Sequence, residues 1–294
     1  MIYVAGDLVT DVLVEHDGDI RIGSDTDAAI RVAGGGQGAN TAAWLASTGH
    51  EVTLIAAVGD DQAGRDRVAE LTAAGVHCAV QVLPGATTGS VVVLTGPGER
   101  TMITDRGASL RLDPGHVTAT LAAAAATGHL HLSAYPLLHA GSRPAGLAAL
   151  TAAARRGLSV SVDAASAAPL RTVGAGIFLD WVRDTDLLLC NADEADVLAG
   201  PGSAAEQAVR LAAHVRNAVV KQGPAGAVWA GPDGVWPLAV EPVPVTDPTG
   251  AGDAFAAGLL RAWCSGATPE EALRAGAALG AKAVSRVGAR PAPH

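Results

Sequence analysis

The sequence predicts an α/β fold in which a mostly parallel central sheet is covered by helices on both faces. Short apolar runs recur along the chain without polar alternation, which is typical of strands buried on both faces, and alanine-rich stretches of helical length separate them. The expected strands are 2–6, 52–59, 128–135, 158–165, 186–193 and 217–224, and the expected helices are 38–47, 64–74, 144–156, 203–215 and 269–284. Such sheets bind ligands at the carboxyl ends of their strands.

Two stretches depart from this rhythm. Residues 11–32 alternate apolar and polar side chains around acidic turns, and residues 90–104 are typical of a hairpin that turns at 96–98. A period of two inside an α/β chain predicts a small, partly exposed sheet outside the main core.

Composition excludes several classes of protein. The 294 residues are 49% hydrophobic, which is too apolar for a disordered chain, and the net charge of −9 gives no broad surface for nucleic acid or anionic membranes. Cys78, Cys190 and Cys264 form no CxxC pair for a zinc site or disulfide framework. No signal peptide is evident at the N-terminus, and the uncharged stretch 114–142 is interpreted as a buried helix and a buried strand, so we expect a cytoplasmic protein.

The two lysines exclude the commonest phosphate loop. Lys221 and Lys282 are the only lysines, and neither lies in a GxxxxGK[ST] motif. The catalytic-loop and DFG motifs of protein kinases are also missing. A bound nucleotide would therefore have its phosphates held mainly by backbone amides and arginines.

The stretch 245–262, VTDPTGAGDAFAAGLLRA, contains the most informative motif. Gly250, Ala251 and Gly252 open a helix, where unpaired backbone N–H groups and the helix dipole favour a phosphate or an oxyanion. Asp253 lies just inside this turn and could accept a proton from a nucleophilic hydroxyl. The alternative is that Asp253 merely caps the helix.

A second glycine-rich turn, AGGGQGANTAAW at 33–44, also leads into a helix. Its spacing is not that of a dinucleotide fingerprint, and no acidic residue lies near position 58. The glycines would let a compact ligand approach the backbone, and Asn40 would either bind that ligand or cap the helix. Asp7 and Asp11, after the first strand, are placed to bind sugar hydroxyls or lie in a surface turn.

Asn191 and Glu194 end one expected strand and begin a helix. Asn191 could cap that helix with Glu194 in its first turn. Alternatively, the pair could hold a hydrated Mg²⁺, which favours oxygen ligands and keeps several waters.

The segments GGGQGAN, NADE, VKQGPAG and DPTGAGDAF, in this order and spacing, resemble the ribokinase-like (PfkB-type) carbohydrate kinases over essentially the whole chain. The resemblance implies one domain, 1–294, with a three-layer ribokinase-like fold and a β-sheet lid formed by about 11–32 and 90–104. It also implies ATP and Mg²⁺ as cofactors, with a monovalent cation such as K⁺ in some members. Exposed edges of the lid could pair two copies into a homodimer.

The resemblance also implies roles for individual residues. Asp253 matches the base that accepts the proton of a primary hydroxyl. Gly250, Ala251 and Gly252 match the anion hole, and Asp11, Gly36, Gln37 and Asn40 match positions at the sugar. Asn191 and Glu194 match positions at Mg²⁺ and the phosphates, and Asp247 and Thr249 match positions at the monovalent cation. Lys221, Gly223 and Gly226 match the nucleotide loop, with adenine against the helix near 278–282.

Departures from the family pattern bear on the substrate. Ribokinases have lysine where Gln37 stands, and they have a glutamate near the end of the strand that reads LSAYP here, at 132–136. Because this sequence shows neither of these charged residues, we expect a neutral sugar or nucleoside as the substrate. We interpret Arg106 as a solvated loop residue, although a guanidinium aimed into the pocket would bind a carboxylate or phosphate. The expected function is an ATP-dependent kinase of a primary hydroxyl. The alternatives are a sugar-acid kinase of the 2-keto-3-deoxygluconate type and a non-catalytic sensor on the same fold.

Overall fold

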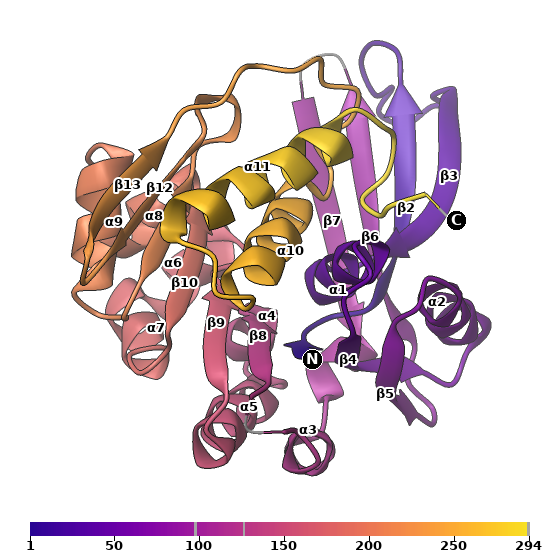
Figure 1. The fold of residues 1–294 in the computed structure, drawn as a ribbon. Helices are drawn as coiled ribbons and strands as arrows, with labels where there is room; N and C mark the ends of the chain where they lie inside the picture. The colour runs from indigo at the N-terminus through magenta and orange to yellow at the C-terminus, as the bar shows by residue number, and fades with distance from the viewer. Residues whose placement is uncertain (97–98, 126, 293–294) are drawn as a thin grey trace.

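A large sheet forms the centre of the molecule (Figure 1). The computed structural model describes residues 1–96, 99–125 and 127–292. Among these residues, nine strands form this sheet in the order β13-β12-β11-β10-β9-β8-β1-β4-β5, and only the pairings of β12 and β13 are antiparallel. The strands are β1 (Ile2–Ala5), β4 (Val52–Gly59), β5 (His77–Leu83), β8 (His129–Ser133), β9 (Ser159–Asp163), β10 (Leu187–Asn191), β11 (Ala218–Lys221), β12 (Ala227–Gly231) and β13 (Gly234–Leu238). The predicted mostly parallel α/β sheet is confirmed.

Helices cover both faces of this sheet and enclose a hydrophobic core on each. One core is formed against α3 (Pro114–Ala122), α4 (Tyr135–Leu138), α5 (Arg143–Arg156), α6 (Ala167–Val173), α7 (Ala175–Trp181), α8 (Ala192–Ala199) and α9 (Ala204–Ala212). The other is formed against α1 (Gln37–Ser47), α2 (Gln62–Ala73), α10 (Ala251–Trp263) and α11 (Pro269–Val284). Short 3₁₀ turns lie at Ala108–Arg111 and Gly223–Ala225. The arrangement is the expected three layers.

The uncharged stretch 114–142 differs in part from its prediction. Strand β8 is buried along its whole length, as expected. Helix α3, however, buries only Val117 and Leu121, because a helix at the surface of the layer needs only one apolar stripe. None of the helices in the described ranges is long and apolar enough to cross a membrane.

Both segments with a period of two contribute to a separate, smaller sheet (Figure 1). In the described part of the chain it has four strands in the order β3-β2-β6-β7: β2 (Val9–His16), β3 (Ala28–Gly35), β6 (Thr88–Gly96) and β7 (Glu99–Gly107). The predicted hairpin is β6–β7, with Gly96 opposite Glu99; positions 97 and 98 of its turn lie outside the described residues. We call these four strands the small sheet.

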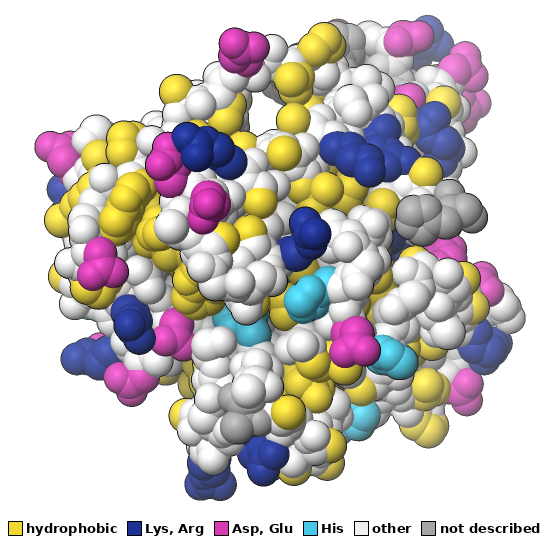
Figure 2. Space-filling view, in the orientation of Figure 1, with side chains coloured by type: hydrophobic (Ala, Val, Ile, Leu, Met, Phe, Trp, Pro, Cys, Tyr) yellow, Lys and Arg dark blue, Asp and Glu magenta, His cyan; other side chains and the backbone are white. Residues whose placement is uncertain are grey.

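The two faces of the small sheet differ in exposure. Val9, Val91 and Val93 are buried together on one face, which Met102 shares. On the opposite face, Ile30, Val32 and Ile103 are exposed. On the face of the molecule drawn in Figure 2, acidic and basic side chains are interspersed.

Candidate active site

A cavity of about 680 Å³ lies at the carboxyl ends of the central strands, bounded by the small sheet and by α10 and α11. Strands β9, β10 and β11 end there in Asp163, Asn191 and Lys221, and Asp7 follows β1. This is where a doubly wound sheet presents polar groups to a ligand.

The two ends of the cavity differ. We call the polar end the part lined by Asp7, Asp11, Gln37, Asn40, Arg106, Asp163, Lys221 and Asp253. We call the apolar end the part lined by Gly223, Pro224, Gly226, Val240, Ala277, Gly280, Ala281 and Val284. The predicted adenine site, between the turn after β11 and the helix near 278–282, falls at the apolar end.

The amino terminus of α10 faces the cavity with Gly250, Ala251 and Gly252. Gly250 precedes the helix at φ 76°, and a Cβ there would lie 2.4 Å from the carbonyl oxygen of Ala289. Glycine is therefore required both by the backbone conformation and by the close approach of the chain's last segment. The backbone amides of this turn are thus held beside the cavity.

Asp253 lies in the first turn of α10 and lines the cavity. Its side chain does not cap the helix; instead, Nδ2 of Asn40 donates to Oδ2 of Asp253 at 2.9 Å. Burial, together with the negative charge of Asp163, raises the pKa of Asp253 to about 7, although the hydrogen bond from Asn40 and the charge of Lys221 oppose the rise. A carboxylate poised near neutral pH suits proton transfer.

Asn40 is not the cap of its helix, so that alternative is wrong. Helix α1 starts three residues earlier, after Gly36, whose φ of 99° and whose close approach to the Asp7 carbonyl require glycine. Asn40 therefore lies within the helix, and its side chain bridges two groups. Its Nδ2 donates to Asp253, and its Oδ1 accepts from Nε of Arg290 at 3.1 Å. Arg290 was not predicted.

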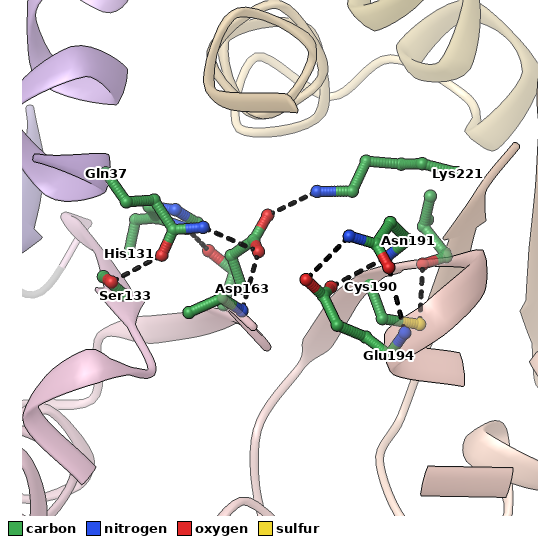
Figure 3. Close-up of polar contacts among 11 residues, drawn as sticks. Gln37, His131, Ser133, Asp163, Cys190, Asn191, Glu194 and Lys221 are labelled. Carbon is green, nitrogen blue, oxygen red and sulfur yellow. Dashed lines mark hydrogen bonds and ion pairs between the residues drawn. The ribbon is translucent and has the colours of Figure 1, made fainter. Parts of the chain in front are cut away.

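Asp163, another residue that the sequence analysis missed, organises the middle of the polar end (Figure 3). Its side chain is almost fully buried and accepts from Nζ of Lys221 at 2.6 Å and from Nε2 of Gln37 at 3.0 Å. The Ser133 hydroxyl donates to the Gln37 amide. Burial lowers the pKa of Lys221, but Asp163 and Glu194 outweigh burial, and the pKa is raised overall. The signal for Asp163 was its place as the one charged residue in the run 158–165.

Arg106 is not a solvated loop residue, contrary to expectation. It lies on β7 with its side chain 12% exposed, because Nη1 donates to Oδ2 of Asp7 at 2.9 Å and the guanidinium lies 3.6 Å from the centre of the Tyr135 ring. Arg106 lines the polar end of the cavity, where the charge of Asp7 balances its own. The backbone N–H of Gly38 also donates to Asp7 at 3.2 Å.

Asn191 and Glu194 form a capping box at the start of α8 and also line the cavity. Oε1 and Oε2 of Glu194 accept from Nδ2 and from the backbone N–H of Asn191, each at 2.8 Å (Figure 3). Burial and the charge of Asp163 together raise the pKa of Glu194 to about 7, although Lys221 and the backbone N–H of Asn191 oppose the rise. The interpretation as a helix cap is confirmed.

Asp247 and Thr249 lie in the turn before α10. Oδ1 of Asp247 accepts from the backbone N–H of Thr249 at 2.8 Å, and Oδ2 accepts from that of Gly288 at 2.9 Å. Thr249 lines the cavity. Within the described ranges, no three His, Cys, Asp or Glu side chains come together as a metal cluster. A divalent ion bound anywhere in the cavity would draw most of its ligands from phosphates and water, as Mg²⁺ commonly does.

Comparisons with known proteins agree with this geometry. The model of the pfkB family carbohydrate kinases matches residues 2–294. An ATP-dependent ribose-1-phosphate kinase of Halopiger xanaduensis is 32% identical over 97% of this chain and 90% of its own length, and a 1-phosphofructokinase of Rhodobacter capsulatus is 32% identical over 91% and 83%. The structure of adenosine kinase from Sinorhizobium meliloti superimposes with a TM-score of 0.88, covering 99% of this chain and 95% of that one at 24% identity.

The fold and the family match thus define a phosphotransferase of the carbohydrate kinase class. The chain belongs to the pfkB family of carbohydrate kinases.

Proposed function

We propose that this protein transfers the γ-phosphoryl group of ATP to a primary hydroxyl of a small sugar or nucleoside, with Asp253 as the base. The observation that carries the proposal is the placement of the Asp253 carboxylate, held by Asn40, in the first turn of a helix whose glycine-rich start faces the same cavity. Phosphoryl transfer depends on positioning, on charge neutralisation and on a base near the nucleophile. One turn of α10 offers both a base and a site for the transferred group.

The remaining roles follow from the two ends of the cavity. Asp11, Gly36, Gln37 and Asn40 would bind the acceptor at the polar end, and Gly223 and Gly226 with α11 would enclose the adenine at the apolar end. A Cβ added to Gly252 would lie 3.6 Å from Nζ of Lys221, so the charge of Lys221 lies beside the proposed anion hole. Lys221 would then contact the phosphoryl group in transit.

Mg²⁺ and a monovalent cation belong to the same proposal. Asn191 and Glu194 fit a hydrated Mg²⁺, since one carboxylate with water and phosphate oxygens suffices, and the ion would neutralise phosphate charge. Asp247 and Thr249 would serve K⁺ from the turn before α10. Turnover in K⁺ compared with tetramethylammonium tests the second ion, and equal rates would remove it.

The small sheet would act as a lid over the acceptor, since Val9, Val91 and Met102 line the cavity from that sheet. Exclusion of water would limit wasteful hydrolysis of ATP. The exposed Ile30, Val32 and Ile103 would bury their surface in a homodimer. Light scattering tests the dimer, which a monomer at working concentration would exclude.

A second class of acceptor is favoured by one observation, the place of Arg106 in the cavity. A guanidinium can bind a carboxylate or phosphate, as a sugar acid or a sugar phosphate would offer. The similarity to a ribose-1-phosphate kinase and to a 1-phosphofructokinase supports the phosphate. The pairing of Arg106 with Asp7 supports the neutral acceptor, because the pair leaves no net positive charge.

Production of ADP with a panel of acceptors, with Mg²⁺ and with EDTA, tests the proposal. The panel holds ribose, fructose, nucleosides, 2-keto-3-deoxygluconate, ribose 1-phosphate and fructose 1-phosphate. We expect Mg²⁺-dependent turnover with a neutral sugar or nucleoside. A preference for an anionic acceptor that Arg106→Ala abolishes would select the second class, and no turnover with any acceptor would indicate a sensor.

A further inference from the structure

Arg290 lies in the last described segment of the chain and reaches the active site from 250 residues away in sequence. Its Nε donates to Oδ1 of Asn40 at 3.1 Å, and its Nη2 donates to the carbonyl oxygen of Gly35 at 2.8 Å. Nη1 lies 3.5 Å from Oε2 of Glu70 on α2, and the side chain is 14% exposed. One guanidinium thus joins the small sheet, α1 and α2, and of its three partners Asn40 lines the polar end of the cavity.

The segment that carries Arg290 is itself fixed. The Ala289 carbonyl accepts from Nε1 of the buried Trp44 at 2.9 Å, and the Gly288 N–H donates to Asp247. The same Ala289 carbonyl makes glycine necessary at position 250, at the start of α10. These contacts fix the position of Arg290 relative to the helix that bears Asn40 and relative to the start of the helix that bears Asp253.

The chemistry of an amide converts this contact into a constraint on Asn40. A guanidinium can only donate hydrogen bonds, so Arg290 requires the oxygen of the Asn40 amide to face it. The NH₂ group of the same amide must then face the other way, and it donates to the Asp253 carboxylate at 2.9 Å. The reversed amide would put oxygen against a carboxylate and NH₂ against a guanidinium.

We propose that Arg290 is a positioning residue for phosphoryl transfer, which fixes the Asn40 amide so that Asn40 holds the Asp253 carboxylate in place. The inference rests on the proposed role of Asp253 as the base. Arg290 itself touches neither Asp253 nor, in this account, the acceptor. It acts through Asn40.

The constraint has a consequence for pH dependence. The charged groups that face Asp253 from the surrounding elements are Asp163, Lys221 and Asp7, and the donor from Asn40 lowers its pKa against the effect of burial. Without Arg290 the Asn40 donor is no longer held, so the carboxylate loses stabilisation and the pKa of Asp253 rises. Since the base must be ionised, the acidic limb of the kcat/KM profile moves to higher pH.

The test compares Arg290→Met with Arg286→Met, which removes a guanidinium from the same segment, 6.0 Å from the centre of the Trp44 ring. We expect Arg290→Met to lower kcat by ~10- to 100-fold, the scale of a small misplacement of a reacting group, with the KM for ATP unchanged and the acidic limb at higher pH. Arg286→Met should match the wild type in all three. A uniform loss of rate without movement of the limb would overturn the inference.

A double-mutant cycle with Asn40→Ala separates action through Asn40 from a general loss of structure. If Arg290 acts through Asn40, adding Arg290→Met to Asn40→Ala costs little more than Asn40→Ala alone. Equal fold losses in both backgrounds would contradict the inference. Should Arg290→Met not fold, Arg290→Lys replaces it: one ammonium cannot reproduce the fork to Gly35 and Asn40, so a partial loss with the same limb movement is expected.

The outcome for Asp253→Asn separates this inference from the proposed function. If Asp253→Asn is inactive but Arg290→Met is normal, the inference fails and the proposed base stands. If Asp253→Asn is fully active, the proposed function fails first.

Discussion

The two ends of the cavity are lined by different kinds of residue. At the polar end, buried charges have partners: Asp7 pairs with Arg106 and Asp163 with Lys221. Asp253 accepts a hydrogen bond from Asn40, which in turn accepts one from Arg290. At the apolar end, the lining is mostly glycine, alanine, proline and valine. The polar end should therefore select its ligand by hydrogen-bond geometry, and the apolar end by shape.

The difference also predicts how each end tolerates change. A paired buried charge that loses its partner leaves an uncompensated charge behind, so substitutions at the polar end should be costly. A small apolar residue leaves no such group, so substitutions at the apolar end should change affinity without affecting chemistry. The three variants below test this contrast in order of expected effect.

The largest effect is expected for Asp253→Asn. The substitution keeps the shape of the side chain but removes the proton acceptor, so kcat should fall by ~10²–10⁴-fold, the range typical of general acid–base catalysis. The amides at the start of α10 remain, so the affinity for ATP, measured by titration calorimetry, should stay close to that of the wild type. Near wild-type kcat would show that the polar end needs no base.

The second largest effect is expected on stability, for Lys221→Met. Asp163 would remain 3% exposed in its side chain with its cation removed, and breaking such a buried pair costs about 3 kcal/mol or more. Urea denaturation measures the free energy of unfolding. The matched control is Lys282→Met, which removes the only other lysine, an exposed residue on α11. Equal stability of the two variants would mean that the Lys221–Asp163 pair contributes nothing.

The smallest effect is expected at the apolar end, for Ala281→Leu. The larger side chain would occupy the space assigned to adenine, and we expect about a tenfold rise in the KM for ATP, roughly 1.4 kcal/mol, with the KM for the acceptor unchanged. Ala278→Leu serves as control, because Ala278 is exposed on the same helix and is not among the residues that line the cavity. A rise in the acceptor KM instead would mean that the two ends are assigned the wrong way round.

The features that could be predicted from the sequence are those that depend on residues close together in the chain. The order of strands and helices, the two segments of the small sheet and the DPTGAGDAF turn each depend on residues close together in the chain. Asn191 and Glu194 were recognised for the same reason, since a capping box spans four residues.

The remaining features of the polar end come from contacts between distant residues. Lys221 is 58 residues from Asp163, Arg106 is 99 from Asp7, and Arg290 is 250 from Asn40. No local pattern distinguishes these arginines from solvated ones, so Arg106 was misjudged and Arg290 was missed. Asn40 was open to interpretation as a cap because the start of α1 depends on Gly36 and on its packing against Asp7.

The pH profile of kcat/KM tests most directly the claim that the polar end holds Asp253 as a base. Burial raises the pKa of Asp253 to about 7, so the carboxyl is mostly protonated below that pH and cannot accept a proton. The account predicts that kcat/KM of the wild type rises with pH through about 7, and that the rise is absent from the residual activity of Asp253→Asn. A wild-type profile that is flat across this range, or a rise that persists unchanged in Asp253→Asn, would contradict it.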